Sequence, residues 1–337
     1  MLTPSLPSEG ASGVPVGAWR RLDAGLFARA ADGTPRTGIL SMTSDDLVTG
    51  TTDLAMTYRI GPFVAVTARG TGVERIANDA SETIGTDAAP QANSRIDVIW
   101  VRATFVLDGD TAPTTTFGVS KGAANQNPQK PPIPAGALEL ATAEVKSSDL
   151  ATQTVLITQT WRYTAAAGGV VRLRNKAEMD AWAPANGALA YRLDTGETIT
   201  RAGGAWEGVT TSYDPVWSAA ATPPTMGQST ISGEYVRRGK WVHFSLRFQI
   251  KTGANGGTGP WRFSLPVQAA AGGRQVVAAH IENAGVAFYP ATGTIEGGSN
   301  VVGLIAHTGT GGGGGLSSAA GLGADSIVAI SGSYRAA

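Results

Sequence analysis

The sequence contains no cysteine, so disulfides, thiolate zinc sites and cysteine nucleophiles are all excluded. It also has no run approaching the roughly 18 consecutive apolar residues that a membrane-spanning helix requires. The first residues, Met1 to Ser5, have neither a basic start nor an apolar stretch, so we expect no secretory signal. These absences predict a protein that is made in the cytoplasm and does not insert into a membrane.

Charged residues are scarce and balanced. Only 15% of the residues are charged, and 26 basic residues stand against 26 acidic ones. Because the exposed faces of helices need Lys and Glu, this composition argues against an ordinary helical enzyme. Without a net charge, no overall field attracts the chain to nucleic acid or to anionic lipid. Residues 217–337 hold eight basic and four acidic residues, an excess too small to predict a polyanion site by itself.

Glycine is abundant, with 45 residues, and many segments alternate large and polar side chains. Residues 233–248 and 257–267 show this period of two most clearly, and glycines stand at their starts. The period is typical of half-buried antiparallel strands. Glycine and threonine suit short strands that are joined by tight turns. We therefore predict an all-β fold with several domains.

The composition changes twice along the chain, which predicts three domains. Residues 1–165 form an N-terminal β domain that begins with a Pro-, Ser- and Gly-rich arm over residues 1–16. Residues 166–216 form a small β-rich linker unit. Residues 217–337 form a β-sandwich of the jelly-roll type, with about eight strand-like runs.

The N-terminal domain has its strongest strand pattern at residues 96–101. We expect this strand to continue through Phe105 and Leu107 to a turn at residues 108–110. Residues 108–136 carry five prolines and are predicted to be a long connection without a strand.

A further strand is predicted at residues 138–145, after the proline-rich connection. In the linker unit, Asn175 can N-cap a short helix over residues 176–182. A hairpin is expected to follow, with strands at residues 187–193 and 197–201 around a glycine-bearing turn.

The chain shows no recognisable catalytic centre. Its histidines lack the spacing of a zinc motif, and no Gly-x-Ser-x-Gly elbow occurs in a strand–turn–helix context. The C-terminal carboxylates lack the context of a hydrolytic pair, and no aspartate-rich turn has the full calcium-loop pattern. We predict no catalytic, cofactor-binding or metal-binding residue, and no enzyme. The histidines are His243, His280 and His307, and the carboxylates are Glu234, Glu282, Glu296 and Asp325.

Aromatic side chains offer another chemistry, because sugars present apolar faces ringed by hydroxyls. Alternation places Trp241, His243, Ser245 and Arg247 on one face of a strand, and Val242, Phe244, Leu246 and Phe248 on the other, apolar face. Trp241 therefore shares a polar face and is expected to be exposed, whereas Trp261 shares an apolar face and is expected in the core. The candidate glycan-binding residues are Trp241, His243, Arg247 and Tyr289.

The order of these segments resembles that of tail-tip or baseplate receptor-binding proteins, also called minor tail proteins, of long-tailed phages of Gram-positive bacteria. The likeness rests on a strand and a proline-rich connection in the first domain, the hairpin of the linker unit, and two strands of the last domain. These segments are residues 93–99, 131–137, 187–191, 194–196, 204–206, 233–239 and 259–266.

The resemblance implies a homotrimer in the virion. Its N-terminal domain would attach to other tail or baseplate proteins, and its C-terminal domain would bind a host cell-wall saccharide. The chain has no long heptad run and no collagen-like Gly-X-Y stretch to form a neck. Two alternatives remain open: a purely structural baseplate, tail or decoration subunit that contacts only virion proteins, and a depolymerase that cleaves the wall polysaccharide.

Overall fold

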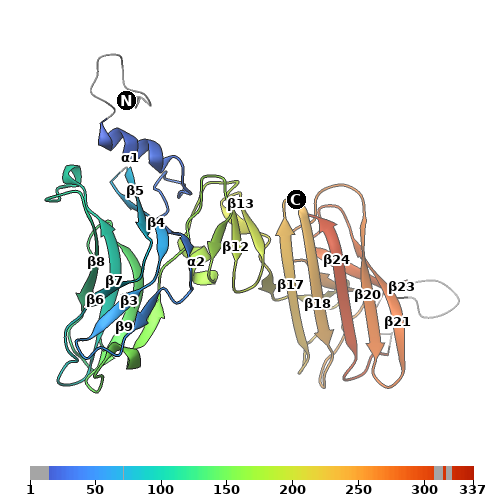
Figure 1. Cartoon of the computed structure of the whole chain (residues 1–337). Coiled ribbons are helices and arrows are strands. Elements are labelled where there is room, and N and C mark those ends of the chain that lie inside the picture. The colour runs from blue at the N-terminus through green and yellow to red at the C-terminus, as the bar shows by residue number, and fades with distance from the viewer. Residues whose placement is uncertain (1–14, 71, 307–313, 316–320) are drawn as a thin grey trace, which may run out of the picture. The chain divides into compact units, whose positions relative to one another are not determined.

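The computed structural model describes residues 15–70, 72–306, 314–315 and 321–337. The chain forms two compact units, Met1–Gly204 and Ala205–Ala337 (Figure 1). Among the described residues, two short α-helices accompany five β-sheets. The predicted all-β, multi-domain fold is confirmed.

Three sheets build most of the first unit, with strand orders β1-β4-β5, β2-β3-β6 and β10-β9-β7-β8. One core lies among them, and Ile39, Tyr58, Ile99 and Leu140 are fully buried in it. The strands are β1 (Gly38–Met42), β2 (Val48–Gly50), β3 (Thr57–Ile60), β4 (Phe63–Arg69), β5 (Gly72–Asn78), β6 (Glu82–Gly85), β7 (Ser94–Ala103), β8 (Thr115–Lys121), β9 (Leu138–Lys146) and β10 (Leu156–Gln159).

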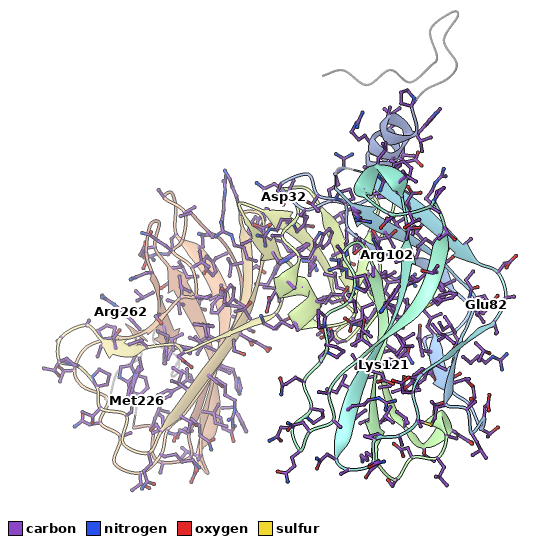
Figure 2. The ribbon with its side chains drawn as sticks, turned by 90° about the vertical axis from the view of Figure 1, so that its left-hand side faces the viewer. Asp32, Glu82, Arg102, Lys121, Met226 and Arg262 are labelled. Carbon is purple, nitrogen blue, oxygen red and sulfur yellow. The ribbon has the colours of Figure 1, made fainter. Side chains whose placement is uncertain are left out.

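The strand predicted at residues 138–145 is confirmed as β9, but two predictions around β7 are wrong. The strand ends at Ala103, and the short 3-10 helix η1 (Val106–Asp108) follows in place of a continued strand. The Asp110 carboxylate accepts the backbone N–H of Phe105 at 2.7 Å, which turns the chain away from the sheet. The proline-rich connection also contains β8, which pairs with β7 along its whole length and ends at Lys121 (Figure 2).

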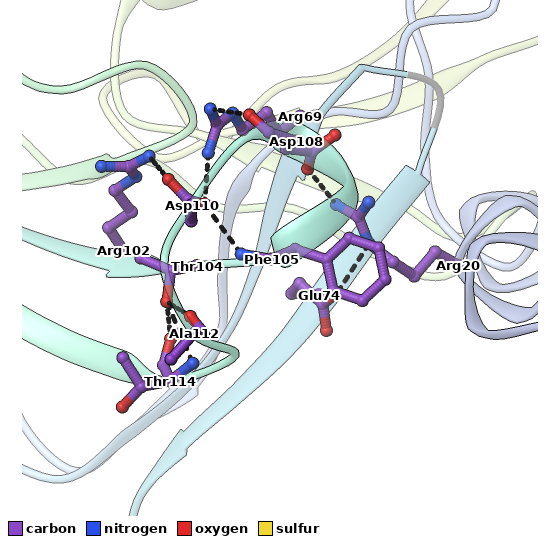
Figure 3. A network of polar contacts seen from close by, with 10 residues as sticks. All are labelled: Arg20, Arg69, Glu74, Arg102, Thr104, Phe105, Asp108, Asp110, Ala112 and Thr114. Atoms are coloured by element: carbon purple, nitrogen blue, oxygen red, sulfur yellow. Dashed lines mark hydrogen bonds and ion pairs between the residues drawn. The ribbon is translucent and has the colours of Figure 1, made fainter.

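The helix α1 (Val16–Ala24) precedes the sheets and is held to them by charge. Its Arg20 is buried, and the guanidinium contacts Glu74 at 2.6 Å and Asp108 at 3.0 Å. The same guanidinium lies 4.2 Å from the centre of the Phe105 ring (Figure 3). Residues 1–14 of the predicted arm lie outside the described residues. No helix in the described part of the chain is long and apolar enough to cross a bilayer.

Asp110 forms a second part of this charge network (Figure 3). Arg69 and Arg102 each donate to its carboxylate at 2.5 Å. The hydrogen bond from Arg69, followed by that from the Phe105 N–H, lowers the pKa of Asp110 from 3.8 to about 2. The carboxylate is therefore more easily kept ionised in the folded chain than in the unfolded chain.

We expect this pKa shift to make the first unit sensitive to acid. A lowered folded-state pKa stabilises the fold above pH 3.8, and this contribution is lost as the pH falls through about 2. In urea titrations between pH 5 and about 2, the midpoint of the wild type should fall toward that of Asp110→Asn, because protonation removes the same interaction. Two parallel midpoint curves over this range would contradict the expectation.

Residues up to Gly204 complete the first unit. The strands β11 (Val171–Leu173), β12 (Leu189–Arg192) and β13 (Thr198–Ala202) lie next to one another, and the hairpin prediction is confirmed. The predicted helix is α2 (Lys176–Ala181), and the Asn175 side chain caps it by accepting the Glu178 N–H at 3.0 Å.

The compact units divide the chain differently from the three predicted domains. Glu178 of α2 forms an ion pair with Arg36 at 2.5 Å, and Arg174 donates to the Gln159 carbonyl at 2.7 Å. These contacts attach residues 166–204 to the N-terminal sheets. Polar groups of the two segments that are withdrawn from water are paired with each other. The boundary therefore falls after Gly204, with no break at residue 165 or 216.

The second unit is built on one antiparallel sheet with the order β15-β17-β18-β24-β20-β21-β22-β19-β16, and β23 pairs with β22. Although β18 and β16 are far apart in this order, the rings of Phe248 and Trp217 are 4.6 Å apart. The sheet is therefore folded over on itself around a shared core, like a sandwich made from a single sheet. Trp261 lies in this core as predicted.

The elements of the second unit follow. They are β14 (Ala205–Glu207), β15 (Thr211–Tyr213), β16 (Trp217–Ala219), β17 (Thr230–Arg238), β18 (Trp241–Gln249), β19 (Trp261–Ser264), β20 (Gln275–Asn283), β21 (Ala287–Ile295), β22 (Val301–Ala306), β23 (Gly314–Gly315) and β24 (Ile327–Arg335). Four of them, β17, β18, β24 and β20, lie side by side in one layer (Figure 1). Their outward face is the surface on which the candidate site lies.

Candidate functional site

Strand β18 divides its side chains between the core and the outward face as its sequence predicts. Its inward side chains are all buried, and they are Val242, Phe244, Leu246 and Phe248. Its outward side chains include Trp241, which is 52% exposed, with His243, Ser245 and Arg247 further along the strand. Three of the four predicted glycan-binding residues therefore lie on one face of one strand.

The pairing register lines up the outward side chains in rows across the sheet. In one row, Arg247 and His280 flank Ala329, because both pair with it from opposite sides. In the neighbouring row, Ser331 lies between Ser245 and Ala278 in the same manner. The middle of this face therefore carries only small side chains, and longer ones rise on either side.

This difference in side-chain length produces a groove of about 540 Å³. Its floor is formed by the small residues of β24 and β20, and its acidic and basic lining residues are Glu234, Arg247 and His280. A second hollow of about 400 Å³ shares Glu234 and Ser245 with it and extends along β18 to His243. The two hollows together follow the outward face toward the Trp241 end of the strand.

Hydrogen bonds already order part of this surface. The Nδ1 atom of His243 is joined to the Ser333 hydroxyl at 2.6 Å, and the Ser245 hydroxyl donates to Glu234 at 3.4 Å. The side chain of Arg247 makes one long contact, from Nη1 to the Gln249 amide oxygen at 3.4 Å. Arg247 therefore keeps most of its donors available to a ligand.

The exposed aromatic ring beside the groove belongs to Phe288, whereas the sequence predicted the neighbouring Tyr289. Phe288 is 67% exposed, and the His280 ring stacks on it with centroids 5.6 Å apart and planes at 24°. The predicted residue Tyr289 is partly buried and packs against the core, so it does not join Trp241, His243 and Arg247. Reading the alternation backwards from the buried Ile295 and Ala291 would have placed Phe288 outward and Tyr289 inward.

The other residues considered from the sequence have local roles or lie apart. Glu296 pairs with Arg274 at 2.7 Å, and Asp325 pairs with Lys251. Glu282 lies on β20, opposite Phe288 of the neighbouring strand. His307 lies outside the described residues. Within the described ranges, no group of three or more His, Asp or Glu side chains could hold a metal ion.

Comparisons with known proteins give no match to this chain among family models, curated proteins or solved structures. The function is therefore argued from the groove and its surroundings. The arrangement offers polar donors and acceptors over a small-residue floor, with exposed aromatic rings at Trp241 and beside His280. Such a surface can pack against the apolar face of a sugar while it hydrogen-bonds the hydroxyls.

Proposed function

We propose that this protein is a tail-tip or baseplate component of a phage virion, and that its second unit binds a host cell-wall saccharide. The observation that carries the proposal is the outward face of β18. It places Ser245 and Arg247 in a groove of about 540 Å³, His243 in the neighbouring hollow, and the exposed Trp241 at the start of the same strand. The first unit then serves as the attachment domain toward other tail proteins.

Shallow grooves of this kind bind sugars weakly one at a time. The proposed homotrimer, repeated around a tail tip, multiplies the number of simultaneous contacts. Linking sites in one particle raises the overall strength of binding by about 10² to 10⁴ without any new contact. Light scattering on the purified protein tests the trimer, and a stable monomer of 34.4 kDa would count against it.

The composition of the groove favours binding over cleavage. Glycoside hydrolases generally use two carboxyl groups on opposite sides of the scissile bond. Among the described residues that line the groove, Glu234 is the single carboxylate. We therefore favour a binding protein over a depolymerase, and the absence of new reducing ends after incubation with wall polysaccharide is the expected result.

Removal of the exposed tryptophan tests the binding proposal directly. Trp241→Ala in the full chain should weaken binding to purified wall polysaccharide by about tenfold or more. An exposed aromatic side chain that becomes buried against a ligand contributes strongly to the binding free energy. The measurement is surface-immobilised binding with polysaccharide from Gram-positive cells. Trp19→Ala is the matched control, because Trp19 is 49% exposed but lies in the first unit.

Two outcomes would contradict the proposed function. One is a wild-type chain that binds no wall polysaccharide at any concentration at which it stays monodisperse. The other is equal loss of binding in Trp241→Ala and Trp19→Ala. Either result would favour the structural alternative, in which the outward face meets another virion protein.

A further inference from the structure

Arg247 and His280 form a basic row in the groove, and no described acidic side chain forms a salt bridge with either of them. Arg247 and His280 both pair with Ala329, one from β18 and the other from β20. Neighbouring strands lie about 4.8 Å apart, so the Cα atoms of Arg247 and His280 are separated by about 10 Å. Both side chains line the groove, and only the methyl group of Ala329 stands between them.

Some basic residues of this unit are neutralised by ion pairs. Among the described residues Arg247, Arg238, Lys240, Arg262 and Arg335 form none, and of these five Arg247 is the one that lines the groove. Arg274 is paired with Glu296 and Lys251 with Asp325. Among the residues that the structure describes, no salt bridge is formed by Arg247, whose single contact is with the neutral amide of Gln249. A guanidinium in a groove whose N–H donors are mostly unused can bind a carboxylate or a phosphate through two parallel hydrogen bonds.

We propose that Arg247 and His280 form a binding site for an anionic group, so that the saccharide ligand is an acidic glycan. The inference rests on the proposed function and specifies the chemistry of its ligand. The guanidinium binds two oxygens of the anion, and a ring N–H of His280 donates to it from the opposite wall. The stack on Phe288 holds the imidazole ring in place.

Glu234 fixes the direction in which such a ligand lies. It stands in the neighbouring row, where it pairs with Ser245, and it would repel an anion placed beside it. Its carboxylate and the hydroxyls of Ser245 and Ser331 are suited to neutral sugar hydroxyls. The acidic group therefore occupies the Arg247 row, and the sugar ring lies over the serine row toward the Trp241 end of the strand.

The anion has two possible sources in a wall glycan, the carboxylate of a uronic acid and the phosphodiester of a polyol phosphate polymer. The test uses the full chain and three probes in calorimetric titrations: an oligogalacturonate, a poly(glycerol phosphate) and the neutral glycan dextran. We expect one acidic probe to bind at least tenfold more tightly than dextran. Arg247→Gln should weaken that binding by about tenfold or more, because a hydrogen bond to a charged group is lost.

Two further variants make the test specific. His280→Gln keeps a side-chain amide donor, so it should lower the affinity for the acidic probe less than Arg247→Gln does. Arg262→Gln is the matched control, since Arg262 is an exposed arginine on β19 of the same unit that does not line the groove (Figure 2). It should bind all three probes like the wild type.

The inference and the proposed function fail in different ways. Binding of dextran as tight as that of the better-binding acidic probe, or equal effects of Arg247→Gln and Arg262→Gln, overturns the anion site and leaves saccharide binding intact. Absence of binding to every glycan, including whole wall polysaccharide, overturns the proposed function. If Arg247→Gln instead abolishes self-association in light scattering, the face is a contact between copies and the anion site is overturned.

Discussion

Asp97→Asn should lower the free energy of unfolding of the first unit by about 3–5 kcal/mol, the usual cost of breaking a buried ion pair from one side. The Asp97 side chain is 0% exposed in the middle of β7. It accepts Arg95 Nε at 2.8 Å, the Thr86 hydroxyl at 2.6 Å and the Tyr58 hydroxyl at 3.2 Å. An amide keeps the shape of this side chain but leaves the Arg95 charge without its counterion.

Asp97 is the carboxylate that forms a salt bridge with Arg95 among the described residues. Burial, together with the neighbouring Asp97 carboxylate, raises the pKa of Tyr58 far above its ordinary value, so its hydroxyl stays a donor. Arg95 also donates to the carbonyls of Ala88 and Asp87, each at 2.6 Å. The Arg95 guanidinium therefore joins the loop at residues 87–88 to β7. If the guanidinium moved, both the loop and the strand would become less stable.

Urea unfolding followed by hydrogen exchange measures this effect, since exchange reports the two units separately. Peptides from β7 and β9 should lose protection in Asp97→Asn, and those from β18 and β24 should not. Asp87→Asn is the matched control, because Asp87 forms an exposed salt bridge with Lys121 at 2.8 Å and its loss should leave the urea midpoint almost unchanged. Equal midpoints for the two variants would show that the Asp97 network contributes little to stability.

The features that could be predicted from the sequence are those set by residues close together in the chain. Alternation in β18 separated Trp241 and Arg247 from the buried Val242 and Phe248 without any knowledge of the partners. The Asn175 cap of α2 was equally predictable, because a cap bonds to a residue three positions away. In both cases the deciding interaction spans only a few residues.

The groove itself could not be predicted, since it depends on pairing between distant segments. Ala329 reaches the side of Arg247 only through the β18–β24 register, and His280 joins the row from β20. A shift of one residue in either pairing would turn these side chains to the core. The end of β7 was mispredicted for a related reason. Phe105 and Leu107 fit a strand pattern, but the hydrogen bond from the Phe105 N–H to the Asp110 carboxylate turns the chain out of the strand.

The two functional alternatives now differ in what they require of one surface. A structural subunit needs the outward face of β18 to be covered by another protein, and a receptor-binding protein needs it open to the host. The guanidinium of Arg247, which forms no salt bridge with a described residue, is compatible with both functions if the virion protein that covers the face is acidic. The response of wall-polysaccharide binding to Trp241→Ala therefore separates them more sharply than any measurement of stability.

Glu178→Gln should detach residues 166–204 from the N-terminal sheets. The Arg36 and Glu178 side chains are almost wholly buried, and Arg36 Nη2 contacts Glu178 Oε1 at 2.5 Å. Arg36 also donates to the Tyr163 carbonyl at 2.8 Å, and its guanidinium lies 4.8 Å from the centre of the Trp182 ring. Burial lowers the pKa of Arg36 to about 10, so the guanidinium remains charged at neutral pH and needs its partner.

We expect Glu178→Gln to cost about 3–5 kcal/mol, because a buried charge is left unpaired. Hydrogen exchange should show peptides from β11 to β13 opening before those of β7 and β9. Asp180→Asn is the matched control on the same helix, where Asp180 forms an exposed pair with Lys176 at 2.7 Å that contributes a few tenths of a kcal/mol. If both variants open the whole unit at once, the ion pair does not hold the small segment in place. The double variant Arg36→Met with Glu178→Gln should recover part of the loss, since it removes the orphaned charge.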